Sequence, residues 1–335
     1  KNRLEAVGEV EECSDFVDYY CDRMEEHEGW IMPLAGSGDE QMNMSVLRPY
    51  GVWAVISPFN FPMALTAGPV AAALIAGNTV VAKPSPITPF AVARLGEIIA
   101  GCDLPPGAFN LVTGENKTVS RELVAGAGVD GVVFTGSYQV GMQLMREDAT
   151  RPLPRPFIAE MGGKNPAIVM RSADLDKAVP GVVQGAFGST GQRCTATSRA
   201  IVEDGIYNEF MDALLAQTAA LTVGDGMDSS KDVAPLASRN QLDTVLEYIG
   251  IGTEEGARLT FGGHQLRGDE FDEGYYVEPT IFTDVATSMR IAREEIFGPV
   301  LSVFRASDLQ DAVRISNDVD FGLSSSVYTR DLVQA

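Results

Sequence analysis

Short apolar runs alternate with longer amphipathic stretches along most of the chain. Apolar side chains recur at helical spacing over residues 4–28, which predicts a first helix. From residue 51 onward, runs typical of buried strands alternate with helical patterns. Parallel strands need a crossover connection, so this alternation predicts βαβ units and a parallel sheet covered on both faces.

The alternation falls into two sets, separated by the pair Gly162-Gly163, where we place a domain boundary. The first set has strands at 51–56, 78–83, 110–112, 131–134 and 157–160 and helices at 65–76, 90–100, 119–125 and 138–146. The second set has strands near 165–169, 199–202, 258–261, 299–304 and 324–328 and helices near 174–185, 207–221, 240–255 and 309–317. Residues 30–49 mix glycine, proline and polar side chains, as is typical of a hairpin or excursion.

Composition narrows the class of protein. The 335 residues suit about two domains, and a hydrophobic share of 45% allows a sizeable core. No run of about 18 apolar residues occurs, and the first residues lack a signal-peptide pattern. The four cysteines are too few for a disulfide framework, and with the two histidines they lack metal-ligand spacing. We expect a soluble cytoplasmic protein with no metal site and no membrane partner.

The chain has 46 acidic and 25 basic residues, a net charge of −21, and shows no basic patch of the kind that nucleic-acid-binding proteins carry. Only six basic residues are lysines. An acidic, lysine-poor surface suits a high-salt cytoplasm, where ions screen the self-repulsion. An ordinary acidic protein explains the composition equally well, and both interpretations stay open. The chain begins without methionine in a helix already under way, so we expect a fragment.

Two glycine patterns are candidates for phosphate binding. The GxGxxG pattern from Gly126 to Gly131 follows a predicted helix and precedes a strand, the reverse of a dinucleotide fingerprint, so we reject it. The segment 134–137 (FTGS), with Gly141 four residues on, ends a strand and opens a helix. The free N–H groups there attract a pyrophosphate, and Ser137 adds a hydroxyl, although a plain helix N-cap explains this serine too.

Polar side chains follow other strands of the first set. Asn60 lies in the proline-stiffened loop 57–62, where a carboxamide can donate to a developing oxyanion. Lys83 follows the next strand and suits a ribose or phosphate contact, or is simply solvated. Glu160 ends the last strand before two glycines, which suits a general base that must move, or a hinge carboxylate.

Cys194 is the sharpest candidate. It follows a flexible glycine segment and directly follows Arg193, whose positive charge favours the thiolate. No histidine lies near it in the sequence, which argues against a cysteine protease. The alternative is a buried structural cysteine.

Taken together and in order, the motifs resemble the aldehyde dehydrogenase superfamily. The matching pieces are SPFNFP at 57–62, KPS at 83–85, FTGS at 134–137, EMGGK at 160–164, GQRCTA at 191–196 and EEIFGP at 294–299. The resemblance covers essentially the whole chain. It implies an α/β fold with a Rossmann-like parallel-sheet cofactor domain and a second α/β catalytic domain, which we expect to be truncated at both ends.

The resemblance also implies a mechanism and its residues. Cys194 attacks the aldehyde carbon, Asn60 stabilises the oxyanion, and Glu160 activates the water that hydrolyses the thioester. NAD or NADP takes the hydride. The implied cofactor-binding residues are Ser57, Phe59, Lys83, Gly114, Phe134, Gly136, Ser137, Gly141, Met161, Gly162, Glu295 and Phe297. The family usually has a ribose-binding glutamate three residues after the lysine, where this chain has Pro86.

The expected domain organisation follows from the same resemblance. We expect a dinucleotide-binding domain at 1–29 and 50–162, an oligomerisation hairpin at 30–49, and a catalytic domain at 163–335. The partners are a small aldehyde and further copies of the chain, as a homodimer or homotetramer.

Likeness within the superfamily is divided between two branches. The stretch RPYGVWAVISPFNFP favours glutamate 5-semialdehyde as the substrate, whereas the second half of the chain resembles 2-oxoglutarate semialdehyde dehydrogenases. The first is our main expectation and the second its alternative. A CoA-acylating semialdehyde dehydrogenase and a non-catalytic binding protein on this fold remain as further alternatives. Glu160 argues against the first, and the intact Asn60, Glu160 and Cys194 argue against the second.

Overall fold

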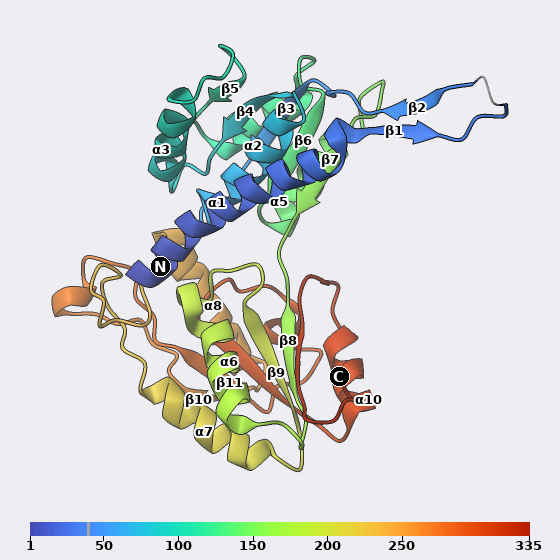
Figure 1. Ribbon diagram of the computed structural model, residues 1–335. Coiled ribbons are helices and arrows are strands. Elements are labelled where there is room, and N and C mark those ends of the chain that lie inside the picture. The colour runs from blue at the N-terminus through green and yellow to red at the C-terminus, as the bar shows by residue number, and fades with distance from the viewer. Residues whose placement is uncertain (39–40) are drawn as a thin grey trace. The chain divides into compact units, whose positions relative to one another are not determined.

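The computed structural model describes residues 1–38 and 41–335, which form two compact units (Figure 1). We call residues 7–161 the N-terminal unit, and residues 1–6 together with 162–335 the C-terminal unit. Each unit is described by itself.

The first helix, α1 (Arg3–Glu26), contributes to both units. Its first turn is grouped with the C-terminal unit, whereas our expectation from the sequence assigned residues 1–29 to the dinucleotide-binding domain. The first turn is grouped with the C-terminal unit because the side chains of Asn2 and Glu5 form hydrogen bonds with Asp232 and Ser189 of that unit.

The N-terminal unit is built on a five-stranded parallel sheet with the order β5-β4-β3-β6-β7. Its strands are β3 (Val52–Ile56), β4 (Thr79–Lys83), β5 (Phe109–Leu111), β6 (Gly131–Thr135) and β7 (Phe157–Glu160). Its connecting helices are α2 (Ala64–Ile75), α3 (Pro89–Ala100), a π-helical turn (Asn116–Ser120), α4 (Arg121–Ala125) and α5 (Tyr138–Asp148). The strand order changes direction between β3 and β6, as in Rossmann-like sheets, which bind ligands at this point.

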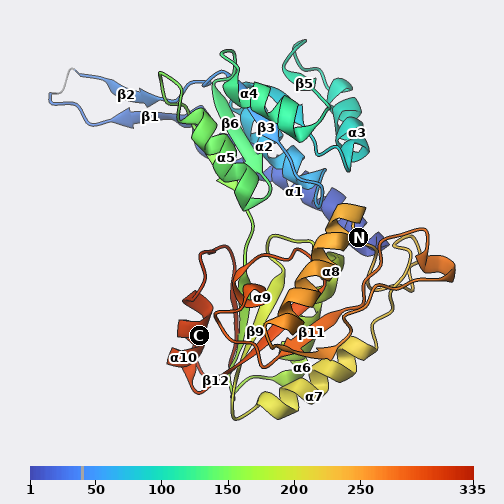
Figure 2. The ribbon, with the colours of Figure 1, turned by 180° about the vertical axis from the view of Figure 1, so that it is seen from behind.

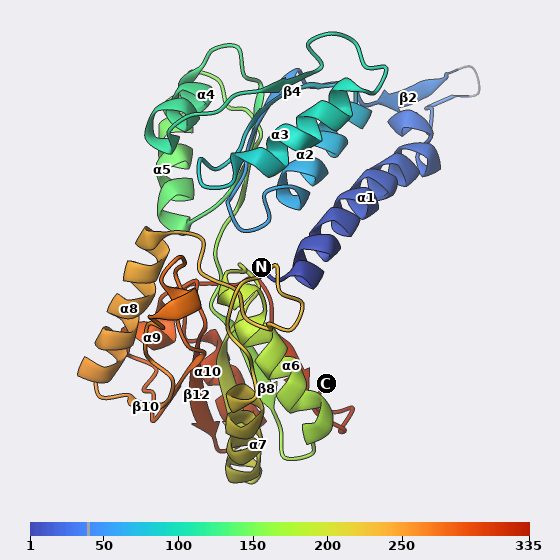
Figure 3. The ribbon, with the colours of Figure 1, turned by 90° about the vertical axis from the view of Figure 1, so that its left-hand side faces the viewer.

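Alternating side chains of β3 show how the sheet is covered. Ala54 and Ile56 pack in one core cluster with residues of α4 and α5, whereas Val55 packs in another with residues of α2. Successive side chains of a strand point to opposite faces, so helices must cover both. Figure 3 shows α2 and α3 on one side of this sheet and α4 and α5 on the other. This confirms the prediction of a parallel sheet covered on both faces.

A two-stranded antiparallel hairpin extends from the N-terminal unit (Figure 1). Its strands are β1 (Ile31–Leu34) and β2 (Asn43–Val46), preceded by a short 3-10 turn (Glu28–Trp30). All four residues of β1 are exposed, including the apolar Ile31 and Leu34. The predicted hairpin segment spans 30–49, of which residues 39–40 lie outside the described residues.

The C-terminal unit contains a six-stranded sheet with the order β10-β11-β12-β9-β8-β13. Its strands are β8 (Asn165–Val169), β9 (Thr197–Glu203), β10 (Arg258–Phe261), β11 (Thr280–Thr283), β12 (Val300–Ala306) and β13 (Ser326–Tyr328). Its helical segments are α6 (Leu175–Phe187), a 3-10 turn (Gly188–Gly191), α7 (Tyr207–Ala219), α8 (Arg239–Glu254), a 3-10 turn (Asp269–Phe271), α9 (Arg290–Arg293) and α10 (Leu309–Asn317). The sequence did not predict β11.

One pair of this sheet departs from the parallel expectation, since β10 and β11 run antiparallel. Their connection contains no α-helix, so the chain returns without a crossover. The other neighbouring strands are parallel.

Helices cover both faces of this sheet as well (Figure 2). In β9, Ala200 and Val202 pack with α6 and α7, whereas Ile201 packs with α10. A further cluster joins α8 and α9 to β11 and β12. The α/β fold class is therefore confirmed, with a Rossmann-like parallel sheet in one unit and a second, mixed sheet in the other. Of the helices within the described ranges, none has the length and hydrophobicity to cross a bilayer.

Candidate active site

The backbone just before Cys194 adopts an unusual conformation. After α6 ends at Phe187, the chain enters the turn Gly188–Gly191. Ser189, Thr190 and Gly191 have φ angles of 49°, 60° and 65°. Two of these are non-glycine residues in the left-handed region, which costs on the order of 1–3 kcal/mol each and persists only where surrounding contacts hold it. The turn places Cys194, which is half-buried, between α6 and β9.

Asn165 holds the Cys194 segment from the start of β8. Its Nδ2 donates to the carbonyl oxygens of Cys194, at 2.8 Å, and of Ala196, at 3.0 Å. Its Oδ1 accepts from the backbone N–H of Ser324 at 3.0 Å. The buried amide therefore uses both of its ends to fix the backbone on either side of the cysteine.

Glu295 lies against the two glycines of the EMGGK motif. Its Oε1 accepts from the N–H of Gly163 at 3.1 Å. A Cβ on Gly162 would lie 2.0 Å from Oε2 of Glu295, and one on Gly163 would lie 2.7 Å from the Cys194 carbonyl oxygen. Burial raises the pKa of the Glu295 carboxyl, while the Gly163 N–H and the charge of Lys164 oppose this rise. The glycines are thus needed for close approach.

Phe297 shares a narrow cavity with Glu295. Gly163, Arg193 and Thr197 line the same cavity. Phe297 has a φ of 59°, and its carbonyl accepts from Nε2 of Gln241 at 2.9 Å. The C-terminal unit therefore brings Glu295, Phe297 and the residue before Cys194 together.

In the N-terminal unit, Ser57 and Lys83 lie at the ends of β3 and β4. The Ser57 N–H donates to the Lys83 carbonyl at 3.0 Å, and its hydroxyl accepts from Thr66. The Lys83 side chain is fully buried and donates to the Pro84 carbonyl, at 3.0 Å, and to Asn116. Burial lowers the pKa of this lysine. Lys83 is therefore not a solvated surface lysine.

Asn60 and Phe59 lie half-buried in the loop between β3 and α2. The Phe59 carbonyl accepts from the Thr88 hydroxyl at 3.1 Å. At the end of the loop, Oε1 of Glu9 in α1 accepts from the N–H groups of Met63, at 2.7 Å, and Ala64, at 3.3 Å. A carboxylate at the N-terminus of α2 thus holds the loop that carries Asn60.

The FTGS segment joins β6 to α5. Ser137 is the N-cap of α5, and its Oγ accepts from the N–H of Val140 at 3.4 Å. A Cβ on Gly136 would lie 2.6 Å from the Phe134 ring, and one on Gly141 would lie 2.6 Å from the sulfur of Met161. The glycines therefore let α5 pack closely on the sheet, while the start of α5 presents its N–H groups at the sheet edge.

Glu160 and Gly114 complete the predicted set in this unit. Glu160 is the exposed last residue of β7, and its carbonyl accepts from the N–H of Gly136 at 3.1 Å. Gly114 follows β5 with a φ of 152°, and a Cβ there would lie 2.6 Å from Val119. Of the rejected GxGxxG glycines, Gly126 and Gly128 lie between α4 and β6 and Gly131 is the first residue of β6, so the pattern forms no strand-to-helix turn.

The predicted residues thus form two sets, one in each unit. In the N-terminal unit they lie in the last residues of parallel strands or in the segments that follow them, at the edge where such sheets bind ligands. This set is Ser57, Phe59, Asn60, Lys83, Gly114, Phe134, Gly136, Ser137, Gly141, Glu160 and Met161. The C-terminal set is Gly162, Cys194, Glu295 and Phe297. Within the described ranges, no three histidine, cysteine, aspartate or glutamate side chains group as a metal site.

Sequence reasoning missed three polar residues around these sets. Asn165 directly follows the EMGGK motif, but its partners lie about 30 residues away. Asn116 pairs with Lys83 across 33 residues, which no local pattern signals. Glu5 contacts Ser189, and only its capping-box spacing from Asn2 was visible in the sequence.

Comparison with known proteins gives the family. The family model described as "Aldehyde dehydrogenase family" matches residues 1–335. The alpha-ketoglutaric semialdehyde dehydrogenase of Bacillus subtilis is 43% identical over 99% of this chain and 67% of its own length. The alpha-ketoglutarate semialdehyde dehydrogenase of Haloferax volcanii is 42% identical over 100% of this chain and 68% of its own.

A solved structure agrees with these relatives. The betaine aldehyde dehydrogenase of Staphylococcus aureus, in complex with NAD+, has a TM-score of 0.96 and 30% identity, covering 100% of this chain and 66% of that one. The chain spans about two thirds of the length of these proteins. The resemblance noted in the sequence is confirmed. The expected enzyme class, an oxidoreductase that acts on aldehydes, and the expected cofactor, NAD or NADP, are confirmed with it. The chain belongs to the aldehyde dehydrogenase family.

Proposed function

We propose that this protein oxidises 2-oxoglutarate semialdehyde to the dicarboxylic acid, with Cys194 as the nucleophile. The observation that carries the proposal is the Cys194 segment itself, a half-buried cysteine whose carbonyl Asn165 holds after a left-handed turn. The two relatives named above act, by their names, on this semialdehyde. They support the alternative from the sequence more than the main expectation, glutamate 5-semialdehyde.

The residues divide the oxidation into two steps. The Cys194 thiolate attacks the aldehyde carbon, and the Asn60 amide donates to the resulting oxyanion. When bound, a nicotinamide cofactor would supply the acceptor for the hydride that leaves this carbon. The thioester left on Cys194 is attacked by water from which Glu160 takes a proton, so the acid leaves and the thiolate returns. Glu160 suits this role because it is the last residue of β7, is exposed to solvent, and precedes two glycines that allow the backbone to move.

The N-terminal sheet edge has the groups that a dinucleotide requires. Contacts among the described residues use two of the three N–H groups of Lys83, which leaves one for a ribose hydroxyl or a phosphate. The start of α5 offers N–H groups to a pyrophosphate. We assign Glu295 and Phe297 to the nicotinamide side.

The hairpin β1–β2 is the proposed contact between copies of the chain. Ile31, Met32, Leu34, Met44 and Val46 are exposed apolar residues on its two short strands. A small hairpin with this surface is stabilised by pairing with further structure. We propose a homodimer or homotetramer, in the cytoplasm, where a nucleophilic thiol stays reduced.

The test compares three variants in one assay. Cys194→Ala should abolish the burst of NADH on mixing with aldehyde, whereas Cys102→Ala, which removes an exposed free thiol, should leave it unchanged. Glu160→Gln should keep a stoichiometric burst, turn over slowly, and show an acyl adduct on Cys194 by intact mass. A burst in Cys194→Ala would contradict the mechanism.

The substrate is tested separately in the unmodified protein. We expect kcat/KM for 2-oxoglutarate semialdehyde to exceed that for glutamate 5-semialdehyde and for succinate semialdehyde. A higher value for glutamate 5-semialdehyde would overturn the substrate assignment and leave the mechanism intact.

A further inference from the structure

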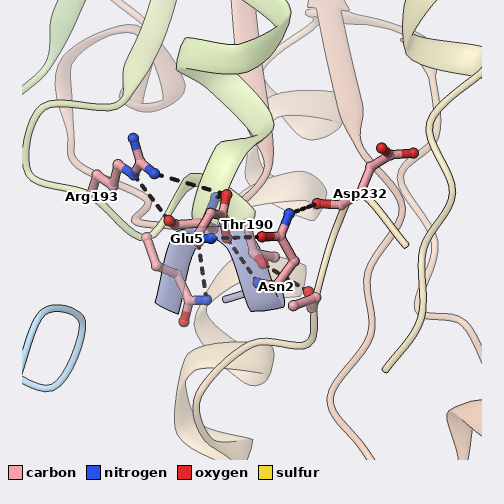
Figure 4. Close-up of polar contacts among 8 residues, drawn as sticks. Asn2, Glu5, Thr190, Arg193 and Asp232 are labelled. Carbon is pink, nitrogen blue, oxygen red and sulfur yellow. Dashed lines mark hydrogen bonds and ion pairs between the residues drawn. The ribbon is translucent and has the colours of Figure 1, made fainter. Parts of the chain in front are cut away.

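The carboxylate of Glu5 contacts the strained turn before Cys194 (Figure 4). Its Oε1 accepts from the N–H of Ser189 at 2.6 Å and lies 3.8 Å from a guanidinium nitrogen of Arg193. Its Oε2 accepts from the N–H of Asn2 at 2.9 Å. The Glu5 side chain is only 8% exposed, so these contacts are made largely out of water.

Half of this arrangement is an ordinary helix start. The Asn2 side chain accepts from the N–H of Glu5 at 3.0 Å, and Glu5 returns a bond to the N–H of Asn2, which is a capping box for α1. That role occupies Oε2 alone. The other oxygen reaches across 184 residues of sequence to Ser189, which helix capping does not require.

The turn that Glu5 contacts is held from several directions. The Thr190 hydroxyl donates to the Ala234 carbonyl at 2.7 Å, and Oε1 of Gln192 accepts from the N–H of Ala237 at 3.0 Å. Arg193 donates from Nε to the Ser189 hydroxyl at 3.0 Å. Ser189 is thus bonded on its backbone by Glu5 and on its side chain by Arg193, the residue before the cysteine.

The energetics favour a functional role for this contact. A buried carboxylate and a left-handed serine are both costly by themselves. Each offsets part of the other's cost, because the Ser189 N–H solvates the carboxylate and the carboxylate fixes the turn. Without Glu5, the Ser189 N–H loses its acceptor and the turn loses one of its fixed points, five residues from Cys194.

We propose that Glu5 is a positioning residue for the nucleophile, holding the turn 189–191 and the Arg193 side chain so that Cys194 is presented in its reactive geometry. The inference rests on the proposed function, in which Cys194 attacks the aldehyde. Glu5 does not touch the reacting atoms. Its effect appears in the rate of the thiol's reactions and not in the affinity for cofactor.

The test uses Glu5→Ala and Glu5→Gln in the purified protein. Two rates are measured, the alkylation of Cys194 by iodoacetamide, mapped by mass spectrometry, and the NADH burst on mixing with aldehyde. We expect Glu5→Ala to slow both by about ten- to a hundredfold, since small misplacements of reacting groups cost rates of this order. Glu5→Gln should restore both to within about threefold, because its amide oxygen still accepts from Ser189. The dissociation constant for NADH should stay unchanged.

Three controls separate positioning from folding. Asn2→Ala removes the capping box but leaves Ser189 its acceptor, so it should lower the melting temperature and keep both rates. Glu11→Gln removes a charge from an exposed position of α1 and should change nothing. Alkylation of the exposed Cys102 serves as an internal reference in every variant.

Several outcomes would overturn the proposal. Unchanged rates in Glu5→Ala would do so, as would equal rate losses in Glu5→Ala and Asn2→Ala. If Glu5→Ala does not fold, Glu5→Asp decides, because it keeps the charge and withdraws the oxygens by one methylene. Full rates in Glu5→Asp would then refute positioning. A burst that survives in Cys194→Ala would instead refute the proposed function, whatever Glu5 does.

Discussion

The backbone N–H of Gly163 donates a 3.1 Å hydrogen bond to the carboxylate of Glu295, and Gly162, which has no side chain, leaves room for that carboxylate. A Cβ on Gly162 would lie 2.0 Å from Oε2 of Glu295. The carboxylate is the end of a flexible side chain, so it can move aside without disturbing the backbone. The glycine thus determines where Glu295 lies more than whether the unit folds.

We therefore expect Gly162→Ala to weaken cofactor binding with little effect on stability. If Glu295 holds the nicotinamide-side ribose, the dissociation constant for NAD should rise about tenfold, the loss of roughly one hydrogen bond to a charged group. Gly128→Ala is the matched control, since a Cβ there meets nothing within 4 Å. Equal affinities in the two variants would remove Glu295 from the cofactor site. A weakened Gly128→Ala would reopen the rejected GxGxxG pattern.

A second prediction concerns Glu9, which holds the N-terminus of α2. Glu9→Ala leaves the Met63 and Ala64 N–H groups without the acceptor that now binds them, which costs about 1–3 kcal/mol of unfolding free energy. The loop with Asn60 should also loosen, so kcat should fall. Urea denaturation and steady-state kinetics measure the two effects. Glu9→Gln keeps an acceptor and should lose less of each. A fall in stability with an unchanged kcat would show that the loop does not depend on Glu9.

The sequence predicted most strands because each is a compact apolar run between turn residues. The prediction failed at β11 (Thr280–Thr283), where four residues lie between Pro279 and Asp284. Two of the four are threonines, so the run looks polar. The strand exists because its neighbours β10 and β12 pair with it on both sides, and no local pattern carries that information.

The chemistry-bearing residues were visible for a different reason. Cys194, Asn60 and Glu160 lie in motifs whose neighbours are glycine and proline, and such motifs can be read along the chain. Glu5 and Asn165 act through partners that are distant in the sequence, so only the fold brings them to the Cys194 segment. The sequence also could not show whether Lys83 is solvated or buried, because its burial depends on the packing around β4.

A third prediction follows from the buried amine of Lys164. Its Nζ has no hydrogen-bond partner among the residues that the structure describes. Burial, and then the charge of Arg199, lower its pKa from 10.5 to about 7. The unfolded chain therefore binds more protons than the folded one between these two values. The contribution of Lys164 to the free energy of unfolding therefore rises with pH across that window, by about 1.4 kcal/mol per pH unit.

We accordingly expect Lys164→Met to stabilise the protein most near pH 7 and progressively less toward pH 10. Denaturation midpoints in urea at several pH values, compared with the unmodified protein, measure the difference. Lys177→Met replaces an exposed lysine and serves as the surface control. Parallel stability curves for Lys164→Met and the unmodified protein would show that this amine is not held neutral.

The final prediction concerns Pro86, the position where the family usually carries a glutamate. Such a glutamate would accept from the adenine-ribose hydroxyls and would repel the 2′-phosphate of NADP, because two like charges in one pocket are costly. Pro86 is exposed and uncharged, so it neither accepts nor repels through its side chain. Three residues earlier, Lys83 keeps one N–H beyond its bonds to the Pro84 carbonyl and Asn116. Removal of the repulsion does not by itself create a phosphate site, so we expect NAD and NADP to be used with comparable efficiency.

The measurement is the ratio of kcat/KM for NAD over NADP, in the unmodified protein and in Pro86→Glu, which should move the ratio toward NAD. A preference of the unmodified protein for NAD above about a hundredfold (2.7 kcal/mol) would contradict dual use, as would a ratio that Pro86→Glu leaves in place.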